Sequence, residues 1–341
     1  MVKNNHRIVL RADGNSIIGL GHVIRLLGLF EFIKNEFDCV FLIRKPELKL
    51  KHIIGSYCRF LILEGTLKDE IEELSYLLDS NDIVVLDGYY FDEEYQQYIK
   101  SKVHKLVMID DKAEAYFYAD LVINHGGALM KAKYKTEPYT RLLLGTDYLI
   151  LRNEFLEAAL TKRIVTKVDS VFICMGGADP FNITIKALKA SIKCDFISRI
   201  IVITGSAYSN NDDLKKALVE APRSKDVLYE NNVNPSRLVE LIRMCEIAIC
   251  PSSSIALEVC CVKAGLLTGI VTDNQESIHN MLVSSDCCLS LNDFNETSVE
   301  SIQVNLYRMN NVDYINTLIK NQSENIDGLS GRRFLQEFKL L

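Results

Sequence analysis

Several features are missing from this sequence of 341 residues, and each absence excludes a class of protein. The chain has no strong excess of basic residues: its formal net charge is −6, so nucleic-acid binding has no electrostatic support. No apolar run approaches the roughly 20 residues that a membrane-spanning helix needs. The first seven residues lack the apolar segment of a signal peptide. We therefore expect a cytoplasmic protein that neither binds nucleic acid nor inserts into a membrane, and we expect it to be a monomer.

Metal-binding and disulfide patterns are missing too. The ten cysteines form no C-x-x-C pair; Cys39, Cys174 and Cys250 lie in apolar, strand-like runs, and Cys260 and Cys261 in a predicted helix. Buried free thiols that pack as small hydrophobic side chains explain this placement best. No group of His, Cys, Asp and Glu has the spacing of metal ligands, so we expect no metal and no cofactor, although loop aspartates could in principle hold magnesium.

Short apolar runs alternate with amphipathic stretches along the whole chain, a pattern typical of parallel sheets covered by helices. There are more predicted strands than one typical sheet holds, and the polar stretch 161–168 favours a division there. We therefore expect an α/β protein with two doubly wound Rossmann-like domains, residues 1–160 and 161–341, and a ligand site in the cleft between them. The predicted strands are 8–10, 39–43, 60–63, 83–86, 106–109, 121–123, 170–174, 200–203, 227–229, 247–250 and 266–270.

The most informative segment runs from Arg11 to Arg25 and reads RADGNSIIGLGHVIR. A glycine-containing loop joins a predicted strand to a predicted helix, and His22 stands where that helix begins. Gly19 and Gly21 leave room for a ligand, and the helix N-terminus favours a phosphate or a developing negative charge. The third glycine of the dinucleotide fingerprint is missing, which argues against NAD and FAD. A simple turn with a helix cap explains the same residues without catalysis.

A second glycine loop follows the predicted strand 170–174. Gly176 and Gly177 lead into a helix whose N-terminus could bind an anion, and Asn182 could cap this helix or touch a ligand. A tight turn in which Asp179 and the following proline end the strand explains the pattern equally well.

A serine-rich loop and an acidic residue follow a later predicted strand. The hydroxyls of Ser253 and Ser254, with the free N–H groups of a helix start, suit a diphosphate. Glu258 lies one turn into this helix and can accept hydrogen bonds from a ribose diol, and Asn274 and Gln275 offer amide groups to a sugar. Helix caps and a surface charge explain each residue alone, but their order and spacing together favour a nucleotide-sugar site.

The motif R-A-D-x-x-x-x-I-G-x-G-H-x-x-R over residues 11–25 resembles the opening motif of the PseG family. Those enzymes hydrolyse UDP-2,4-diacetamido-2,4,6-trideoxy-β-L-altropyranose in pseudaminic acid biosynthesis. The resemblance implies a GT-B fold related to that of MurG, and cleavage between the anomeric carbon and the UDP oxygen with inversion and without metal. Further matches span nearly the whole chain in the same order: D-G-Y at 87–89, D-D at 110–111, G-T-D-Y at 145–148, G-G-A-D at 176–179 and N-Q-E-S at 274–277.

The resemblance also implies roles for individual residues. His22 is expected to be the general base that activates water, and Glu258 the ribose ligand. Asp13 is a candidate to orient His22, although nothing in the sequence fixes that contact. The residues expected to bind substrate are Arg11, Gly19, Gly21, Arg25, Tyr89, Gly176, Gly177, Asn182, Ser253, Ser254, Glu258, Asn274 and Gln275.

Three other functions compete with a UDP-sugar hydrolase. A GT-B glycosyltransferase would move the sugar to an acceptor hydroxyl instead of water. A hydrolysing UDP-sugar 2-epimerase would act on a related substrate, and a regulator would bind the nucleotide sugar without turnover. The presence of His22 weighs against the regulator, and the absence of an obvious apolar and basic membrane-facing patch weighs against a lipid-acceptor transferase.

Overall fold

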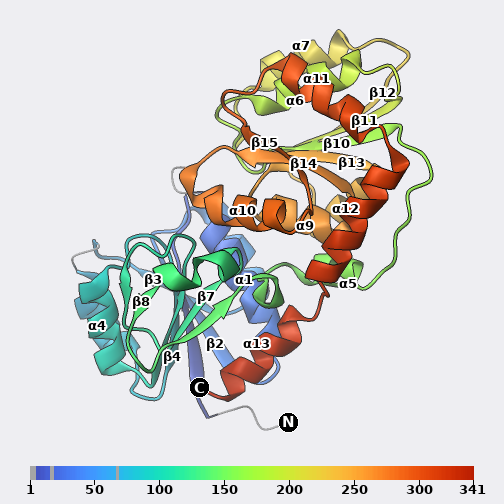
Figure 1. The fold of residues 1–341 in the computed structure, drawn as a ribbon. Coiled ribbons are helices and arrows are strands. Elements are labelled where there is room, and N and C mark those ends of the chain that lie inside the picture. The colour runs from blue at the N-terminus through green and yellow to red at the C-terminus, as the bar shows by residue number, and fades with distance from the viewer. Residues whose placement is uncertain (1–4, 16–18, 67–68) are drawn as a thin grey trace. The chain divides into compact units, whose positions relative to one another are not determined.

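The computed structural model describes residues 5–15, 19–66 and 69–341, which form two compact units (Figure 1). Unit 1 comprises the described residues up to Leu151 together with 329–341, and unit 2 comprises residues 152–328. Each unit contains a parallel sheet with helices packed against it, as the alternation of apolar and amphipathic stretches predicts.

The main sheet of unit 1 has seven parallel strands in the order β3-β2-β1-β4-β5-β7-β9. Its strands are β1 (Arg7–Arg11), β2 (Asp38–Arg44), β3 (Phe60–Leu63), β4 (Ile83–Asp87), β5 (Lys105–Ile109), β7 (Leu121–Asn124) and β9 (Arg141–Leu144); β6 (Tyr116–Phe117) and β8 (Lys135–Thr136) form a separate pair. The helices are α1 (Gly21–Ile33), α2 (Leu48–Tyr57), α3 (Glu70–Leu77), α4 (Glu93–Lys102), the 3₁₀ helices η1 (Gly127–Lys133) and η2 (Thr146–Tyr148), and α13 (Ser330–Lys339).

Two apolar clusters cover the two faces of this sheet. On one face, buried side chains of α1, α2 and α13 pack against residues such as Leu10, Ile109 and Ile123. On the other face, α3 and α4 pack against residues such as Val9 and Met108. The alternation of side chains along each strand therefore decides which residues point toward α1.

The sheet of unit 2 has six parallel strands in the order β12-β11-β10-β13-β14-β15. Its strands are β10 (Ser170–Cys174), β11 (Arg199–Thr204), β12 (Asp226–Asn231), β13 (Ile247–Pro251), β14 (Gly265–Ile270) and β15 (Leu289–Asp293). The helices are α5 (Asn153–Ala159), α6 (Ile183–Lys193), α7 (Asn211–Val219), α8 (Pro235–Arg243), α9 (Ser254–Val262), η3 (Asp273–Gln275), α10 (Glu276–Ser284), α11 (Val299–Met309) and α12 (Val312–Asn325).

The structure divides the chain differently from the boundary expected at residue 160. Helix α5 packs against α8 and α9 and is part of unit 2, whereas α13 returns to unit 1 and packs against α1 (Figure 1). The rings of Phe334 and Phe32 are stacked with centroids 5.8 Å apart, and those of Phe338 and Phe37 meet edge to face at 6.4 Å. Because Phe334 and Phe338 are buried in the core of unit 1, the chain ends in the unit where it begins.

Two smaller expectations can also be compared with the structure. Of the ten cysteines, all except Cys58 are buried, which confirms that they pack as hydrophobic side chains. Within the described ranges, no helix has both the length and the apolar character needed to cross a membrane.

Candidate functional site

The loop before α1 leaves its backbone accessible at the positions where the sequence has glycine. Gly19 has a φ of +78°, a left-handed conformation that glycine adopts without strain. A Cβ atom built on Gly19 or Gly21 would meet no atom of the described residues within 4 Å. Leu20 is the N-cap of α1, and its own side chain makes no capping hydrogen bond. Residues 16–18 of the predicted loop lie outside the described residues.

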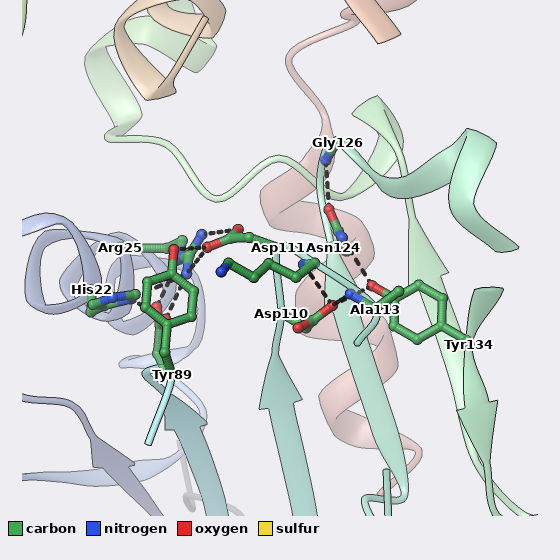
Figure 2. Close-up of polar contacts among 11 residues, drawn as sticks. His22, Arg25, Tyr89, Asp110, Asp111, Ala113, Asn124, Gly126 and Tyr134 are labelled. Atoms are coloured by element: carbon green, nitrogen blue, oxygen red, sulfur yellow. Dashed lines mark hydrogen bonds and ion pairs between the residues drawn. The ribbon is translucent and has the colours of Figure 1, made fainter. Parts of the chain in front are cut away.

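His22, the second residue of α1, contacts a carboxylate at the end of β4. Its Nδ1 atom lies 2.7 Å from Oδ1 of Asp87, which is fully buried (Figure 2 shows the group around His22). Nη2 of Arg25 also lies near this nitrogen, but at 3.4 Å, and a guanidinium can only donate. The carboxylate of Asp87 can only accept, and its contact is much shorter, so we assign the proton to Nδ1 as the donor. In the neutral ring of this tautomer, Nε2 keeps its lone pair.

Arg25 follows His22 by one helical turn and joins two carboxylates. Its Nε and Nη2 donate to Asp87 at 2.7 and 2.6 Å, and its Nη1 and Nη2 donate to Asp111 at 2.6 and 3.1 Å. Burial by itself would raise the pKa of both carboxyl groups. The charge and hydrogen bonds of Arg25 outweigh burial and hold both pKa values below their ordinary range, so both carboxylates are ionised at neutral pH.

Tyr89 lies beside His22 on the exposed side of this cluster. The two rings meet edge to face with centroids 4.9 Å apart, and Tyr89 is 54% exposed (Figure 2). Its hydroxyl donates to Asp111 at 3.0 Å, and Nζ of Lys112 lies 5.4 Å from the centre of its ring. An aromatic ring, an ammonium group and an imidazole therefore gather at the carboxyl end of the sheet in unit 1.

A second set of hydrogen bonds holds the two loops after β5 and β7. Asp110 accepts from the hydroxyl of Tyr134 at 2.8 Å and from the N–H of Ala113 at 2.7 Å. Asn124 donates to the same hydroxyl at 2.9 Å and accepts from the N–H of Gly126 at 3.0 Å (Figure 2). Burial raises the pKa of Asp110, and these bonds only partly offset that effect. These hydrogen bonds fix the backbone on both loops: next to Asp111 in the loop after β5, and next to His125 in the loop after β7.

The sequence-based suggestion that Asp13 orients His22 is wrong. Asp13 instead accepts hydrogen bonds from Arg11 at 2.5 and 2.9 Å, from the N–H of Arg44 at 2.8 Å and from the hydroxyl of Tyr90 at 2.7 Å. Asp87 occupies the position expected for Asp13 because β4 lies next to β1 in the sheet and ends beside the start of α1.

Arg11 was expected to touch substrate, but the structure buries it. Its side chain is 1% exposed, and it donates to Asp13 and, at 2.7 and 3.0 Å, to both oxygens of Glu70, which is itself fully buried. The hydroxyl of Tyr95 donates to the same carboxylate at 2.6 Å. Arg11 therefore stabilises the base of the loop and is sealed from solvent.

In unit 2, the chain itself occupies the anion site expected at the start of α6. The carboxylate of Asp179 accepts hydrogen bonds at 2.8 Å from the N–H groups of the first two residues of α6. Because the carboxylate of Asp179 already occupies these N–H groups, it opposes the binding of a ligand anion to them. The expectation that the N-terminus of α6 binds an anion is therefore corrected. Asn182 is in the left-handed conformation and accepts from the hydroxyl of Tyr208 at 2.8 Å. Gly176, with a φ of +80°, and Gly177 both face open space.

At the start of α9, no carboxylate of the described residues accepts from the first N–H groups of the helix. Ser253 is its N-cap but makes no side-chain cap bond, and Ser254 is exposed. Glu258 is 7% exposed and accepts a hydrogen bond from Nη2 of Arg152 at 2.6 Å. Burial raises the pKa of Glu258, and the charge of Arg152 opposes this. Glu258 is therefore a buried, paired carboxylate and not a surface charge.

Asn274 and Gln275 lie in η3, directly after β14. The side-chain oxygen of Gln275 accepts from the N–H of Val271 at 2.9 Å, and that of Asn274 accepts from the hydroxyl of Thr272 at 2.6 Å. These bonds hold the turn and fix the orientation of both amide groups.

Sequence reasoning assigned no role to several residues of these clusters: Asp87, Asp111, Lys112, His125 and Arg152. The signal available for Asp87 and Asp111 was an acidic residue after a predicted apolar strand: Asp87 directly follows 83–86, and the pair at 110–111 directly follows 106–109. In the described part of the chain, no three side chains of His, Cys, Asp or Glu are grouped as metal ligands would be.

Comparisons with known proteins give relatives of low identity and structures of the same fold. No protein-family model matches the chain. It is 27% identical to the uncharacterized protein MJ1062 of Methanocaldococcus jannaschii over 69% of this chain and 50% of that protein, so it spans half the length of that relative. It is 26% identical to UDP-2,4-diacetamido-2,4,6-trideoxy-beta-L-altropyranose hydrolase of Campylobacter jejuni, over 80% of this chain and 94% of that enzyme. This second match supports the resemblance to the PseG family.

Among solved structures, MurG of Acinetobacter baumannii superposes with a TM-score of 0.71 at 10% identity, over 98% of this chain and 100% of MurG. At this identity the likeness shows the fold alone. It confirms the expected α/β class, with two doubly wound Rossmann-like units of the GT-B fold.

Proposed function

We propose that this chain hydrolyses a UDP-linked 2,4-diacetamido-2,4,6-trideoxy sugar to UDP and the free sugar, in the biosynthesis of a nonulosonic acid such as pseudaminic acid. The observation that carries the proposal is the 2.7 Å contact between Nδ1 of His22 and Asp87, which leaves Nε2 able to take a proton from water. The activity named for the Campylobacter jejuni relative and the opening motif over residues 11–25 support the choice of reaction and substrate.

In this mechanism, Nε2 of His22 removes a proton from water as the oxygen attacks the anomeric carbon from the side opposite UDP. The bond between that carbon and the UDP oxygen breaks, UDP leaves as an anion, and the configuration at the carbon inverts. The ionised carboxylate of Asp87 stabilises the imidazolium that forms. General-base assistance of this kind contributes about 10²–10⁴-fold to the rate.

We assign the UDP to the start of α9. Its N–H groups have no side-chain cap, in contrast to those of α6, which Asp179 occupies. Ser253, Ser254 and the open backbone of Gly176 and Gly177 can approach the diphosphate closely. Held there, the diphosphate is a good leaving group that needs no strong general acid. Glu258 accepts from the ribose hydroxyls while Arg152 keeps it in place.

Isotope labelling tests this proposal directly. The protein is incubated in ¹⁸O-water with the UDP-2,4-diacetamido sugar and with UDP-GlcNAc, without any acceptor. We expect ¹⁸O in the free sugar and none in UDP, with NMR showing the inverted anomer as the first product. Label in UDP would indicate attack at phosphorus and refute the mechanism. Turnover that begins only when an acceptor is added would identify a glycosyltransferase, and an epimerised sugar from UDP-GlcNAc a hydrolysing 2-epimerase.

A further inference from the structure

The pairing of strands in the sheet of unit 1 places a second histidine near the cluster formed by His22, Arg25, Asp87 and Asp111. Asp87 is paired with Ile109 on β5, and Ile109 is paired with Ile123 on β7. Side chains two positions apart on a strand point to the same face. Asp111 and His125 each lie two positions beyond these paired isoleucines, and the N–H of Asp110 still donates to the carbonyl of Ile123 at 2.9 Å. Asp111 lies two residues after the end of β5 and His125 directly after the end of β7, so both stand at the carboxyl end of the sheet, where α1 begins.

Contacts and charges agree with this placement. Asp111 is bound by Arg25 from α1, so its side chain lies on the α1 face. His125 and Asp111 each affect the pKa of the other, and Arg25 and Asp87 also act on His125. Four groups from α1 and from the ends of three neighbouring strands therefore share one local electrostatic environment.

His125 differs from the other polar groups of this cluster in its hydrogen bonding. It is 4% exposed, yet among the described residues no hydrogen bond reaches either of its ring nitrogens. Its nitrogens are not among the fully buried side-chain atoms without a partner, so they keep a small accessible surface that water or a ligand group can reach. His22, Arg25, Asp87 and Asp111 all have partners within the chain.

We propose that His125 is a further substrate-binding residue of the His22 site, where its ring hydrogen-bonds to a hydroxyl or acylamino group of the sugar. This inference rests on the proposed function, because it assumes that the sugar binds beside His22. A neutral imidazole has one donor and one acceptor, which matches a hydroxyl or an N–H beside a carbonyl.

The protonation state of His125 fits this role. Burial, helped by the charge of Arg25, lowers its pKa to about 4, while the carboxylates of Asp111 and Asp87 only partly oppose that shift. The ring is therefore neutral at physiological pH. It is a poor general acid there but retains both its donor and its acceptor for the sugar.

The test separates sugar binding from UDP binding and from turnover. His125→Phe keeps a ring of similar size without hydrogen bonds, and His125→Gln keeps a donor and an acceptor. We expect His125→Phe to raise KM for the UDP-sugar about tenfold with kcat changed little, since it removes one hydrogen bond made in the ground and transition states alike. His125→Gln should recover part of this loss. The Kd for UDP alone should not change in either variant. His52→Gln, at an exposed position of α2, is the matched control.

Calorimetry in a His22→Asn background measures UDP-sugar binding without turnover, and thermal melting establishes that each variant is folded. If the wild type hydrolyses the sugar and folded His125→Phe binds it as tightly as the wild type, His125 is a packing residue and the inference is overturned. If the wild type neither binds nor hydrolyses any UDP-sugar, the proposed function itself fails, and this inference fails with it. An equal loss of affinity for UDP alone would also overturn it, because the effect would then not be specific to the sugar.

Discussion

His22 and Asp87 lie 65 residues apart in the sequence and 2.7 Å apart in the fold. The contact exists because β4 pairs with β1 in the sheet, so the end of β4 meets the helix that follows β1. It joins the ring N–H of a histidine at a helix start to a buried carboxylate, on the side of the ring away from the nitrogen proposed as the base.

Replacing His22 with asparagine removes the proposed base while keeping a smaller polar side chain at the second residue of α1. We expect kcat to fall by about two to four orders of magnitude with the UDP-sugar Kd and the melting temperature little changed. Steady-state kinetics, calorimetry and thermal melting of this variant and of His52→Asn are the measurements. A kcat within a few-fold of the wild type would remove His22 from the mechanism.

Asp87→Asn tests the orienting contact. The amide can donate to Nδ1 and so favour the tautomer with its proton on Nε2, which cannot accept a proton from water. We expect kcat to fall by about two orders of magnitude or more with a smaller change in KM. Asp111→Asn is the comparison, because Asp111 binds Arg25 and Tyr89 but does not contact His22. Equal losses of kcat in the two variants would contradict the special role of Asp87.

Arg25→Leu leaves two buried carboxylates without their cation, and we expect a loss of about 3–5 kcal/mol in the free energy of unfolding at neutral pH. In the wild type, the lowered pKa values of Asp87 and Asp111 contribute stability that is present above about pH 4 and is lost as the pH falls through the folded values. Without Arg25, burial raises the pKa values of both carboxyl groups, so these groups can take up protons at mildly acidic pH. The loss in the free energy of unfolding relative to the wild type should therefore be smaller at pH 5 than at pH 7.5.

Urea denaturation of the wild type and Arg25→Leu at those two pH values measures this difference. Arg59→Leu is the control, because Arg59 and its partner Asp38 are both exposed and such a pair contributes about 0–1 kcal/mol. A deficit that is the same at both pH values would contradict the electrostatic explanation.

Glu258→Ala tests the ribose assignment in unit 2. A hydrogen bond to a charged group contributes roughly 1.5–3 kcal/mol, so the Kd for UDP should rise by about 10- to 150-fold. Calorimetry with UDP is the measurement, and Glu240→Ala, at an exposed position of α8, is the control. Unchanged affinity for UDP in the folded variant would refute the assignment.

Chelation tests the expectation that the reaction needs no metal. The carboxylates of Asp87 and Asp111 are already paired with Arg25, and the proposed base is an imidazole. We expect the rate of UDP-sugar hydrolysis to be the same with and without EDTA. Loss of activity in EDTA that magnesium or manganese restores would show that a cation takes part.

The strands were predictable because most are continuous apolar runs, such as 83–86, that fully buried parallel strands require. β15 was missed because its end, Asn292 and Asp293, is polar and exposed, and β9 was missed because its apolar run, 142–144, is only three residues long. The order of strands in a sheet is a tertiary property, so local patterns could place His22 on a helix start but could not pair it with Asp87. For the same reason, the prediction that Asp13 orients His22 was wrong. Asp13 is nearer to His22 in the sequence than Asp87 is, but Arg11 and Tyr90 bind its carboxylate.

The return of α13 to unit 1 has a consequence for dissecting the protein. A fragment that stops near residue 151 would leave the apolar side of α1 without Phe334 and Phe338, and α1 carries His22 at its start. Removing 329–341 from the far end of the chain would expose the same surface. Unit 1, which carries the proposed base, is therefore not a contiguous piece of sequence: producing it alone calls for a short linker that connects residue 151 to residue 329.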